Sequence, residues 1–370
     1  MTHKLDRRDF IRRLLTVSAA GAAWGLSGCG SRPTPGAATP TSPAVPARSL
    51  PPTATAVPTN APSAARAATA VPTAASAQNP TAAPTVEPAT PTSAPAAAAS
   101  AYLAVARGAG ADPAELTRRA IAAIGGIEQF VKPGANVIVK PNICNAYHGP
   151  EYASTTNPDV IAAIVALGLG AGAKRVRVMD FPFGGSPQAG YETSGIAAAV
   201  KAAGGVMEAM NRLKFRKTAL PQGKVLRSSN VYGDILDADT VINVPIAKNH
   251  GSATLTLGMK NLMGVIQDRN TLHAIGLHQA IADLNSAVKP QLTIVDAIRI
   301  LTANGPTGGS LDDVKRLDTV IASADVVAAD AYAATLFDMK PADVKYIKLG
   351  AEMGLGTLDL GSKRVEEISV

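Results

Sequence analysis

Short β-branched segments alternate with Ala-rich segments of helical period from residue 102 to the end of the chain. This pattern predicts strands at 102–107, 136–140, 175–179, 224–227, 240–244, 291–295 and 319–323. It predicts helices at 113–124, 158–169, 195–203, 257–266, 274–288, 326–337 and 342–353. Several strands are apolar on both faces, which is typical of a parallel sheet buried between helices. Residues 101–370 are therefore expected to form a three-layer α/β domain, with a mostly parallel sheet and helices on both faces.

Residues 30–100 lack this alternation. They consist mainly of Ala, Pro, Thr and Ser, contain 15 of the 27 prolines, and have no aromatic residue. Such a composition cannot bury enough apolar surface to offset the entropy lost on ordering. We expect residues 30–100 to be a disordered linker.

The first 29 residues have the features of an export signal. Arg7 and Arg8, followed by Phe10 and Ile11, resemble a twin-arginine translocation signal. The segment ends in Leu-Ser-Gly-Cys, which resembles a lipobox with Cys29 as the lipidated residue. These motifs predict a signal peptide over 1–29 and a lipoprotein in the cell envelope, extracytoplasmic and lipid-anchored to the membrane. The alternative is an ordinary thiol after an ordinary signal peptide.

Charge and cysteine content narrow the function classes. The formal net charge is +7, but residues 101–370 contain 27 Lys and Arg against 25 Asp and Glu. The excess lies mostly before the domain, so nucleic acid is excluded as an expected partner.

Two cysteines exclude a disulfide scaffold and an iron–sulfur cluster held by this chain alone. No cofactor is predicted; a divalent metal remains an open alternative, with no metal ligands assigned. No apolar run reaches the length of a membrane-spanning helix, about 20 residues.

Polar, Gly-rich segments follow five of the predicted strands. The carboxyl ends of parallel strands lie at one edge of a sheet, where loop amides and helix N-termini converge on ligands. We therefore expect these segments to share one cleft. They are 140–145, 180–187, 248–252, 296 with 304–309, and 325.

Several of these motifs resemble the pattern of the domain-of-unknown-function family 362. The resemblance covers nearly all of residues 101–370 and implies the α/β domain. Members often carry ferredoxin-like cysteine clusters, which this chain lacks, and the resemblance implies no particular reaction. The motifs are Lys140-Pro141-Asn142, Thr155-Thr156-Asn157-Pro158, Asp180 with 184–187, Lys248-Asn249-His250, Thr256 with Lys260-Asn261-Leu262-Met263-Gly264, Asp296 with Asn304-Gly305-Pro306, and 323–325 through Asp330.

The cationic residues of these motifs suit a carboxylate or phosphate ligand. Lys260 is expected in the first turns of a helix whose dipole favours anions. The alternative is that the lysines lie on a solvated face, as isolated lysines usually do. The residues predicted to bind substrate are Lys140, Asn142, Lys248, Lys260, Asn261 and Asn304.

Asp180, Asp296 and His250 are the predicted catalytic residues. A carboxylate at a strand end serves as a general base, a metal ligand or a helix cap, and histidine readily moves protons. Asp330 is expected to be buried against neighbouring backbone or a lysine, and Cys144 to be a small buried residue or a nucleophile.

Two functions remain open at this point. The first is an enzyme that does acid–base chemistry on a small anionic substrate. The second is a non-catalytic lipoprotein that binds a solute or a partner. Burial of Asp180 or Asp296 within hydrogen-bond reach of His250 or a lysine would favour the enzyme.

Overall fold

The computed structural model describes residues 100–370. The predicted signal peptide, Cys29 and all but the last residue of the predicted linker lie outside the described residues. The main sheet has the order β12-β1-β11-β10-β7-β2-β3-β4, and β8 joins it beside β10. Its strands are β1 (Leu103–Arg107), β2 (Asn136–Pro141), β3 (Arg175–Val178), β4 (Val206–Met207), β7 (Thr240–Val244), β8 (Ile246–His250), β9 (Thr254–Thr256), β10 (Leu292–Leu301), β11 (Val314–Ser323) and β12 (Val365–Ser369).

Most pairs in this sheet are parallel. β2 pairs in parallel with β3 and β7, β10 with β7 and β8, and β1 with β12. β11 runs against both of its neighbours, β1 and β10, and β9 returns antiparallel along β8. The carboxyl ends of β2, β3, β7, β8 and β10 therefore point to one edge, and the end of β11 points to the opposite edge.

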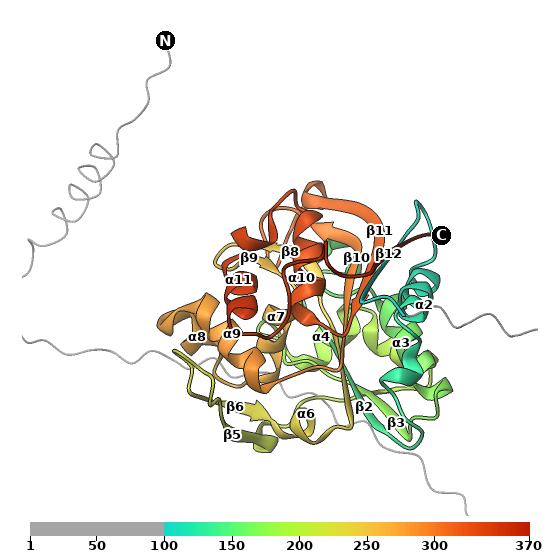
Figure 1. The fold of residues 1–370 in the computed structure, drawn as a ribbon. Helices are drawn as coiled ribbons and strands as arrows, with labels where there is room; N and C mark the ends of the chain where they lie inside the picture. The colour runs from blue at the N-terminus through green and yellow to red at the C-terminus, as the bar shows by residue number, and fades with distance from the viewer. Residues whose placement is uncertain (1–99) are drawn as a thin grey trace, which may run out of the picture. The chain divides into compact units, whose positions relative to one another are not determined.

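Helices cover both faces of the sheet (Figure 1). α2 (Pro113–Ala123), α3 (Pro158–Gly170) and α5 (Ile196–Ala202) pack on one face. α9 (Leu277–Ala287), α10 (Val326–Thr335) and α11 (Lys345–Glu352) pack on the other. The two-residue period of the strands sorts side chains between these layers. The predicted α/β class, with a mostly parallel sheet and helices around it, is confirmed.

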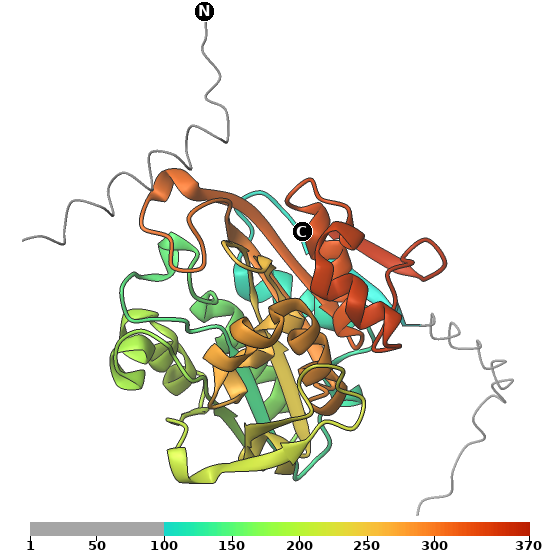
Figure 2. The same ribbon diagram turned by 90° about the vertical axis from the view of Figure 1, so that its left-hand side faces the viewer.

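The remaining helical segments are short. Figure 2 shows the α7–α9 region, in orange, in front of the strands. The helices are α4 (Pro187–Thr193), α6 (Gly233–Asp237), α7 (Gly258–Asn261) and α8 (Arg269–Ile275); the 3-10 turns are η1 (Ile127–Gln129), η2 (Pro150–Tyr152), η3 (Arg212–Lys214), η4 (Leu262–Val265), η5 (Leu311–Asp313) and η6 (Pro341–Asp343). Among residues 100–370, no helix has the length and apolar character needed to cross a membrane.

Five predicted elements differ from the structure, and one of them, the strand over 319–323, begins earlier, at Val314. Residues 224–227 form no strand, because the amides of Val225 and Leu226 bind the Asp283 carboxylate; a separate hairpin, β5 (Phe215–Ala219) and β6 (Ser228–Tyr232), flanks them. The helix expected over 257–266 is α7 followed by η4. The helix over 274–288 begins at 277 as α9, since Gly276 has a φ of 111° and separates it from α8. The strand over 291–295 continues to Leu301, because β10 stays paired with β11.

Candidate active site

A cavity of about 670 Å³ opens at the edge where the parallel strands end. Loops after β2 and β3, strand β8, and the α7–α8 segment line it. Seven of the nine residues predicted as catalytic or substrate-binding are among its lining residues: Lys140, Asn142, Asp180, Lys248, His250, Lys260 and Asn261.

Lys140 and Asp180 form a buried ion pair. Lys140 lies two residues after Ile138 in β2, so its side chain leaves the same face of the sheet as Ile138 and reaches the α7 layer. Its Nζ lies 2.8 Å from Asp180 Oδ1, and it also donates to Pro141 O at 2.7 Å and Asn261 Oδ1 at 2.9 Å. Burial lowers the pKa of Lys140 from its ordinary value, and the contact with Asp180 offsets part of this effect.

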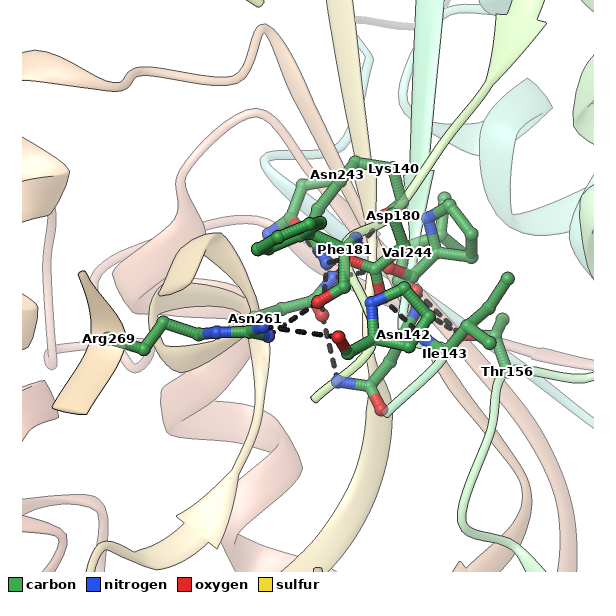
Figure 3. Close-up of polar contacts among 12 residues, drawn as sticks. Lys140, Asn142, Ile143, Thr156, Asp180, Phe181, Asn243, Val244, Asn261 and Arg269 are labelled. Carbon is green, nitrogen blue, oxygen red and sulfur yellow. Dashed lines mark hydrogen bonds and ion pairs between the residues drawn. The ribbon is translucent and has the colours of Figure 1, made fainter. Parts of the chain in front are cut away.

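Both oxygens of the Asp180 carboxylate bind groups of the protein (Figure 3). Its Oδ2 accepts from the amide of Ile143 at 2.6 Å, and its Oδ1 accepts from the amide of Phe181 at 2.8 Å as well as binding Lys140. The carboxylate therefore joins the loop after β2 to the loop after β3. This arrangement suits a positioning residue.

A chain of asparagines connects the strands to α7. Asn142 Nδ2 donates to Asn261 Oδ1 at 2.9 Å, and Asn261 Nδ2 donates to Asn243 Oδ1 at 2.9 Å. Figure 3 shows Asn261 between Asn142 and Asn243. Because these amides bind one another, Asn142 and Asn261 hold the cationic residues in place.

Lys248 is a second fixed cation. It is completely buried in β8, and its Nζ donates to Asn142 Oδ1 at 2.9 Å, Ser154 O at 2.5 Å and Pro306 O at 3.0 Å. The Sγ of Cys144 lies 3.3 Å from the same nitrogen. With these neighbours the ammonium group has no free donor to give a ligand directly.

Lys260 differs from the other two lysines. It lies in α7 and lines the cavity, and its amine makes no hydrogen bond or ion pair with any residue of the described range 100–370. Burial, together with the nearby cations Lys248, Arg269 and Lys140, lowers the pKa of Lys260 to about 7. The amine is therefore present in both protonation states near neutral pH.

His250 is held as a neutral imidazole. Its Nδ1 accepts from the amides of Ser252 at 3.1 Å and Ala253 at 3.2 Å, so the ring proton is on Nε2. Burial first, then Lys260 and Lys248, lower the pKa of His250 to about 3. At neutral pH this histidine is a hydrogen-bond donor through Nε2.

Two arginines that sequence reasoning missed also line the cavity. Arg269 donates to Phe181 O at 2.5 Å, and its guanidinium carbon lies 5.0 Å from the centre of the Phe181 ring; that of Arg212 lies 5.7 Å from the same centre. Neither arginine belongs to a polar, Gly-rich segment that follows a predicted strand, so the sequence pattern used to select candidates did not include them. Five Lys and Arg side chains thus line the cavity against two Asp side chains, Asp180 and Asp268.

Asp296 does not line the cavity, which corrects its place in the predicted cleft. Because β10 continues to Leu301, Asp296 is inside the strand, on the face of Ile294 and Ile298 that packs against the α3 layer. Its oxygens accept from the amides of Asn157 at 2.7 Å and Ile298 at 3.0 Å. Burial raises the pKa of Asp296 to about 6. It faces away from Lys140 and anchors the start of α3.

Asn304 and Asp325 are also outside the cavity. Asn304 is exposed and donates to Asp313 Oδ2 at 2.8 Å, and only Pro306 of its loop reaches the cavity. Asp325 follows β11, whose antiparallel direction takes it to the opposite edge, where it accepts from the amides of Val327 and Ala328 as the N-cap of α10.

Lys260 lies in a helix, as expected, but that helix is a single turn and its dipole is correspondingly small. α7 has four residues, and the carboxylate of Asp330 accepts from its first amides, Gly258 N at 2.6 Å and Met259 N at 2.8 Å. These two amides are therefore taken up by the protein itself. Asp330 is buried against backbone, as expected, and burial raises its pKa to about 8. It fixes the segment that carries Lys260.

The described residues give no support to an iron–sulfur centre. Cys144 is the one cysteine in residues 100–370 and cannot supply the thiolates of such a cluster. Within that range no three His, Cys, Asp or Glu side chains come together in a way that could hold a metal ion.

Known proteins similar to this chain include a curated relative and solved structures with a partly similar fold. A thylakoid-associated protein of Synechocystis sp. is 28% identical over 246 residues, covering 63% of this chain and 72% of that protein. The lactate racemase apoprotein of Thermoanaerobacterium thermosaccharolyticum is 11% identical with a TM-score of 0.39, over 58% of this chain and 53% of that one. A protein from Thermotoga maritima is 13% identical with a TM-score of 0.41, over 62% and 60%. This chain spans less than two thirds of either solved structure.

The family assignment comes from the sequence profile of the domain of unknown function DUF362. It matches residues 137–335, which is more than half of the chain and runs from β2 into α10. The matched range includes the segments that line the cavity, and it confirms the resemblance noted from the motifs. The chain belongs to the DUF362 family.

Proposed function

We propose that residues 100–370 form an enzyme that binds a small anionic substrate in this cavity and moves a proton at it with Lys260. The observation that carries the proposal is the contrast among the cavity lysines. Lys140 and Lys248 are buried and bound to protein acceptors, whereas Lys260 has no partner among the described residues.

The fixed cations supply the electrostatic attraction. Lys140, Lys248, Arg212 and Arg269 surround the cavity, and only Asp180 and Asp268 oppose them. Burial strengthens the attraction between this excess charge and a carboxylate or phosphate, because the effective dielectric constant is lower than in water. A small anion placed among them is in reach of the free amine of Lys260.

Lys260 replaces the earlier candidates as the proton-transfer group. An acid–base catalyst works best when its pKa lies near the operating pH, and the pKa of Lys260 is about 7. Asp180 binds Lys140 and two amides, and His250 Nδ1 accepts from two amides. His250 then contributes the Nε2–H group as a donor to the substrate.

Anion binding is expected to be coupled to proton uptake. A bound anion stabilises the ammonium form of Lys260 and raises its pKa, so binding just above neutral pH takes up as much as about one proton and weakens as the pH rises further. Isothermal titration calorimetry with acetate and pyruvate, which are fully ionised at this pH, measures the uptake in two buffers of different ionisation enthalpy. In Lys260→Met the uptake is expected to vanish and binding to weaken by about 1.5–3 kcal/mol. Uptake that persists in this variant would contradict the role of Lys260.

A binding protein without chemistry is the second candidate. It is favoured by the bonds that Asp180 and His250 Nδ1 make within the protein, which leave Lys260 as the proposed proton-transfer group of the cavity. Proton NMR in D₂O distinguishes the two: an enzyme exchanges a carbon-bound hydrogen of a bound carboxylate, or converts the compound, and Lys260→Met abolishes the change. Tight binding without exchange or turnover for any tested anion would favour the binding protein.

The cellular placement is a separate proposal, which rests on the sequence of residues 1–29. The twin-arginine motif and the lipobox indicate an extracytoplasmic lipoprotein anchored through Cys29. Its partners would then be the membrane, through the lipid, and a small anionic ligand, with no nucleic acid. The name of the Synechocystis relative, a thylakoid-associated protein, accords with membrane association.

Cys29→Ala is expected to move the full-length protein from the membrane fraction to the soluble fraction, because the thioether-linked lipid supplies the anchor. Fractionation and immunoblotting measure this, with Cys144→Ala as the matched control that keeps the anchor. A Cys29→Ala protein that stays in the membrane fraction would rule out the lipobox.

A further inference from the structure

Lys260 is the one cavity lysine whose amine can act as a nucleophile. A lysine attacks carbon only through its neutral form, and Lys140 and Lys248 each donate to three oxygen acceptors. The Lys260 amine has no such acceptor within residues 100–370, and neighbouring cations disfavour its protonation. Surrounding cations activate a lysine in this way for imine formation.

The rest of the cavity fits a carbonyl compound. Thr256 is 97% buried and lines the cavity, and its Oγ1 has no hydrogen-bond partner in the described part of the chain. A buried hydroxyl without a partner is costly, so a ligand that accepts from it is favoured. His250 offers a second donor through Nε2, because its Nδ1 is occupied. These donors suit a carbonyl oxygen, and the cationic excess suits a carboxylate on the same molecule.

We infer that Lys260 forms an imine with an oxo acid, a substrate that carries a ketone or aldehyde carbonyl together with a carboxylate. This inference rests on the proposed function and names its substrate class. The geometry that supports it is an unpartnered amine, an unpartnered buried hydroxyl and a ring of fixed cations around one cavity of about 670 Å³.

The step balances without an added oxidant or reductant. The lone pair of Nζ forms a bond to the carbonyl carbon, and the carbonyl oxygen takes up a proton to give a carbinolamine. The nitrogen releases one proton as the carbinolamine forms, which balances the proton taken up by the oxygen. The hydroxyl then leaves as water with a proton from solvent while the nitrogen lone pair forms the C=N bond, which gives the protonated imine. Release of the remaining N–H proton to solvent gives the neutral imine. The products are the imine and one water molecule. The protonated imine then withdraws electrons from the adjacent carbon, which makes a proton on that carbon easier to remove.

Borohydride trapping tests the inference on the full-length protein. The protein is incubated with pyruvate, glyoxylate or 2-oxoglutarate slightly above neutral pH, sodium borohydride is added, and intact mass and peptide mapping follow. The expected result is one adduct, equal in mass to the oxo acid less one oxygen atom, on Lys260. Labelling should be at least about tenfold faster than at exposed lysines, whose ordinary pKa of about 10.4 keeps them protonated. Lactate, which has the carboxylate but no carbonyl, should give no adduct.

Two variants separate the amine from its charge. Lys260→Arg keeps a cation but cannot form an imine, and Lys260→Met keeps the apolar stem without the amine. Both variants should lose the adduct. Circular dichroism and thermal melting should show that both are folded. Adducts spread over surface lysines, an adduct retained in Lys260→Arg, or no adduct with any oxo acid would overturn the inference. If trapping fails while anion binding still takes up a proton through Lys260, the proposed function stands and the oxo-acid class is wrong. If the proton uptake is absent as well, the proposed function fails with it.

Discussion

Asp180→Ala is expected to lower the free energy of unfolding by about 3–5 kcal/mol, the usual cost of removing one partner of a buried ion pair. Lys140 is completely buried, and without Asp180 its Nζ keeps only the neutral acceptors Pro141 O and Asn261 Oδ1. The amides of Ile143 and Phe181 lose their acceptor as well. Urea or guanidinium denaturation, followed by circular dichroism, measures the loss.

Asp268→Ala is the matched control for this variant. Asp268 lines the same cavity but is exposed, and its side chain accepts a hydrogen bond from Asn230 Nδ2 at 2.8 Å. A change at such a site is expected to stay within about 0.5 kcal/mol. If Asp180→Ala were no more destabilising than Asp268→Ala, Lys140 and Asp180 would not form a pair that stabilises the fold.

Gly264→Ala is expected to lower the free energy of unfolding by about 1–3 kcal/mol through overpacking. A Cβ at this position would lie 2.3 Å from Asp180 Oδ1, 2.6 Å from Lys140 Nζ and 2.7 Å from Lys140 Cε. Both side chains are buried and held by further hydrogen bonds, so neither can retreat into solvent. If the added methyl group separates Lys140 from Asp180, the loss in free energy of unfolding is expected to approach that of Asp180→Ala. The same denaturation experiment measures it.

Gly170→Ala is the control for the added methyl group. Gly170 ends α3, and a Cβ there would have no heavy atom within 4 Å. Alanine is favoured over glycine in a helix by about 0.5–1 kcal/mol, so this variant is expected to be neutral or slightly more stable. Equal stability of Gly264→Ala and Gly170→Ala would show that the η4 turn can move away from the ion pair.

The motifs that this chain shares with the family therefore have a structural role as well as the proposed functional one. Gly264 gives the close approach that lets Lys140 and Asp180 pair beneath the η4 turn, and Asn261 links the same turn to β2 and β7. These residues hold the segment that carries Lys260. Most motif residues therefore position the site, and the proposed reaction falls to Lys260, whose amine has no partner within residues 100–370.

The sequence determined the architecture through local patterns. Apolar strands alternating with amphipathic helices specify a buried parallel sheet, and chain direction then places the loops after β2, β3 and β8 at one edge. That reasoning needs no knowledge of side-chain contacts. It is why seven of the nine predicted residues line one cavity.

Tertiary structure decided the chemistry of individual side chains. Asp296 follows an apolar run, as Lys140 does, but continued pairing of β10 with β11 keeps it within the strand and the two-residue period turns it to the α3 face. Asp325 lies at the opposite edge of the sheet because β11, which precedes it, pairs antiparallel with both β1 and β10. Strand direction and strand length depend on pairing partners that are distant in sequence, so no local sequence pattern predicted them.

The same reason applies to the three lysines. Lys140, Lys248 and Lys260 are alike in sequence, each a lysine of a polar motif that lies within a predicted strand or helix or follows one closely. Folding brings Asn261 to Lys140, and Asn142 and Pro306 to Lys248, from segments far away along the chain. Within residues 100–370 it brings no such acceptor to the Lys260 amine. The sequence thus determined that cations gather at this edge, and the long-range contacts decided which of them can exchange a proton.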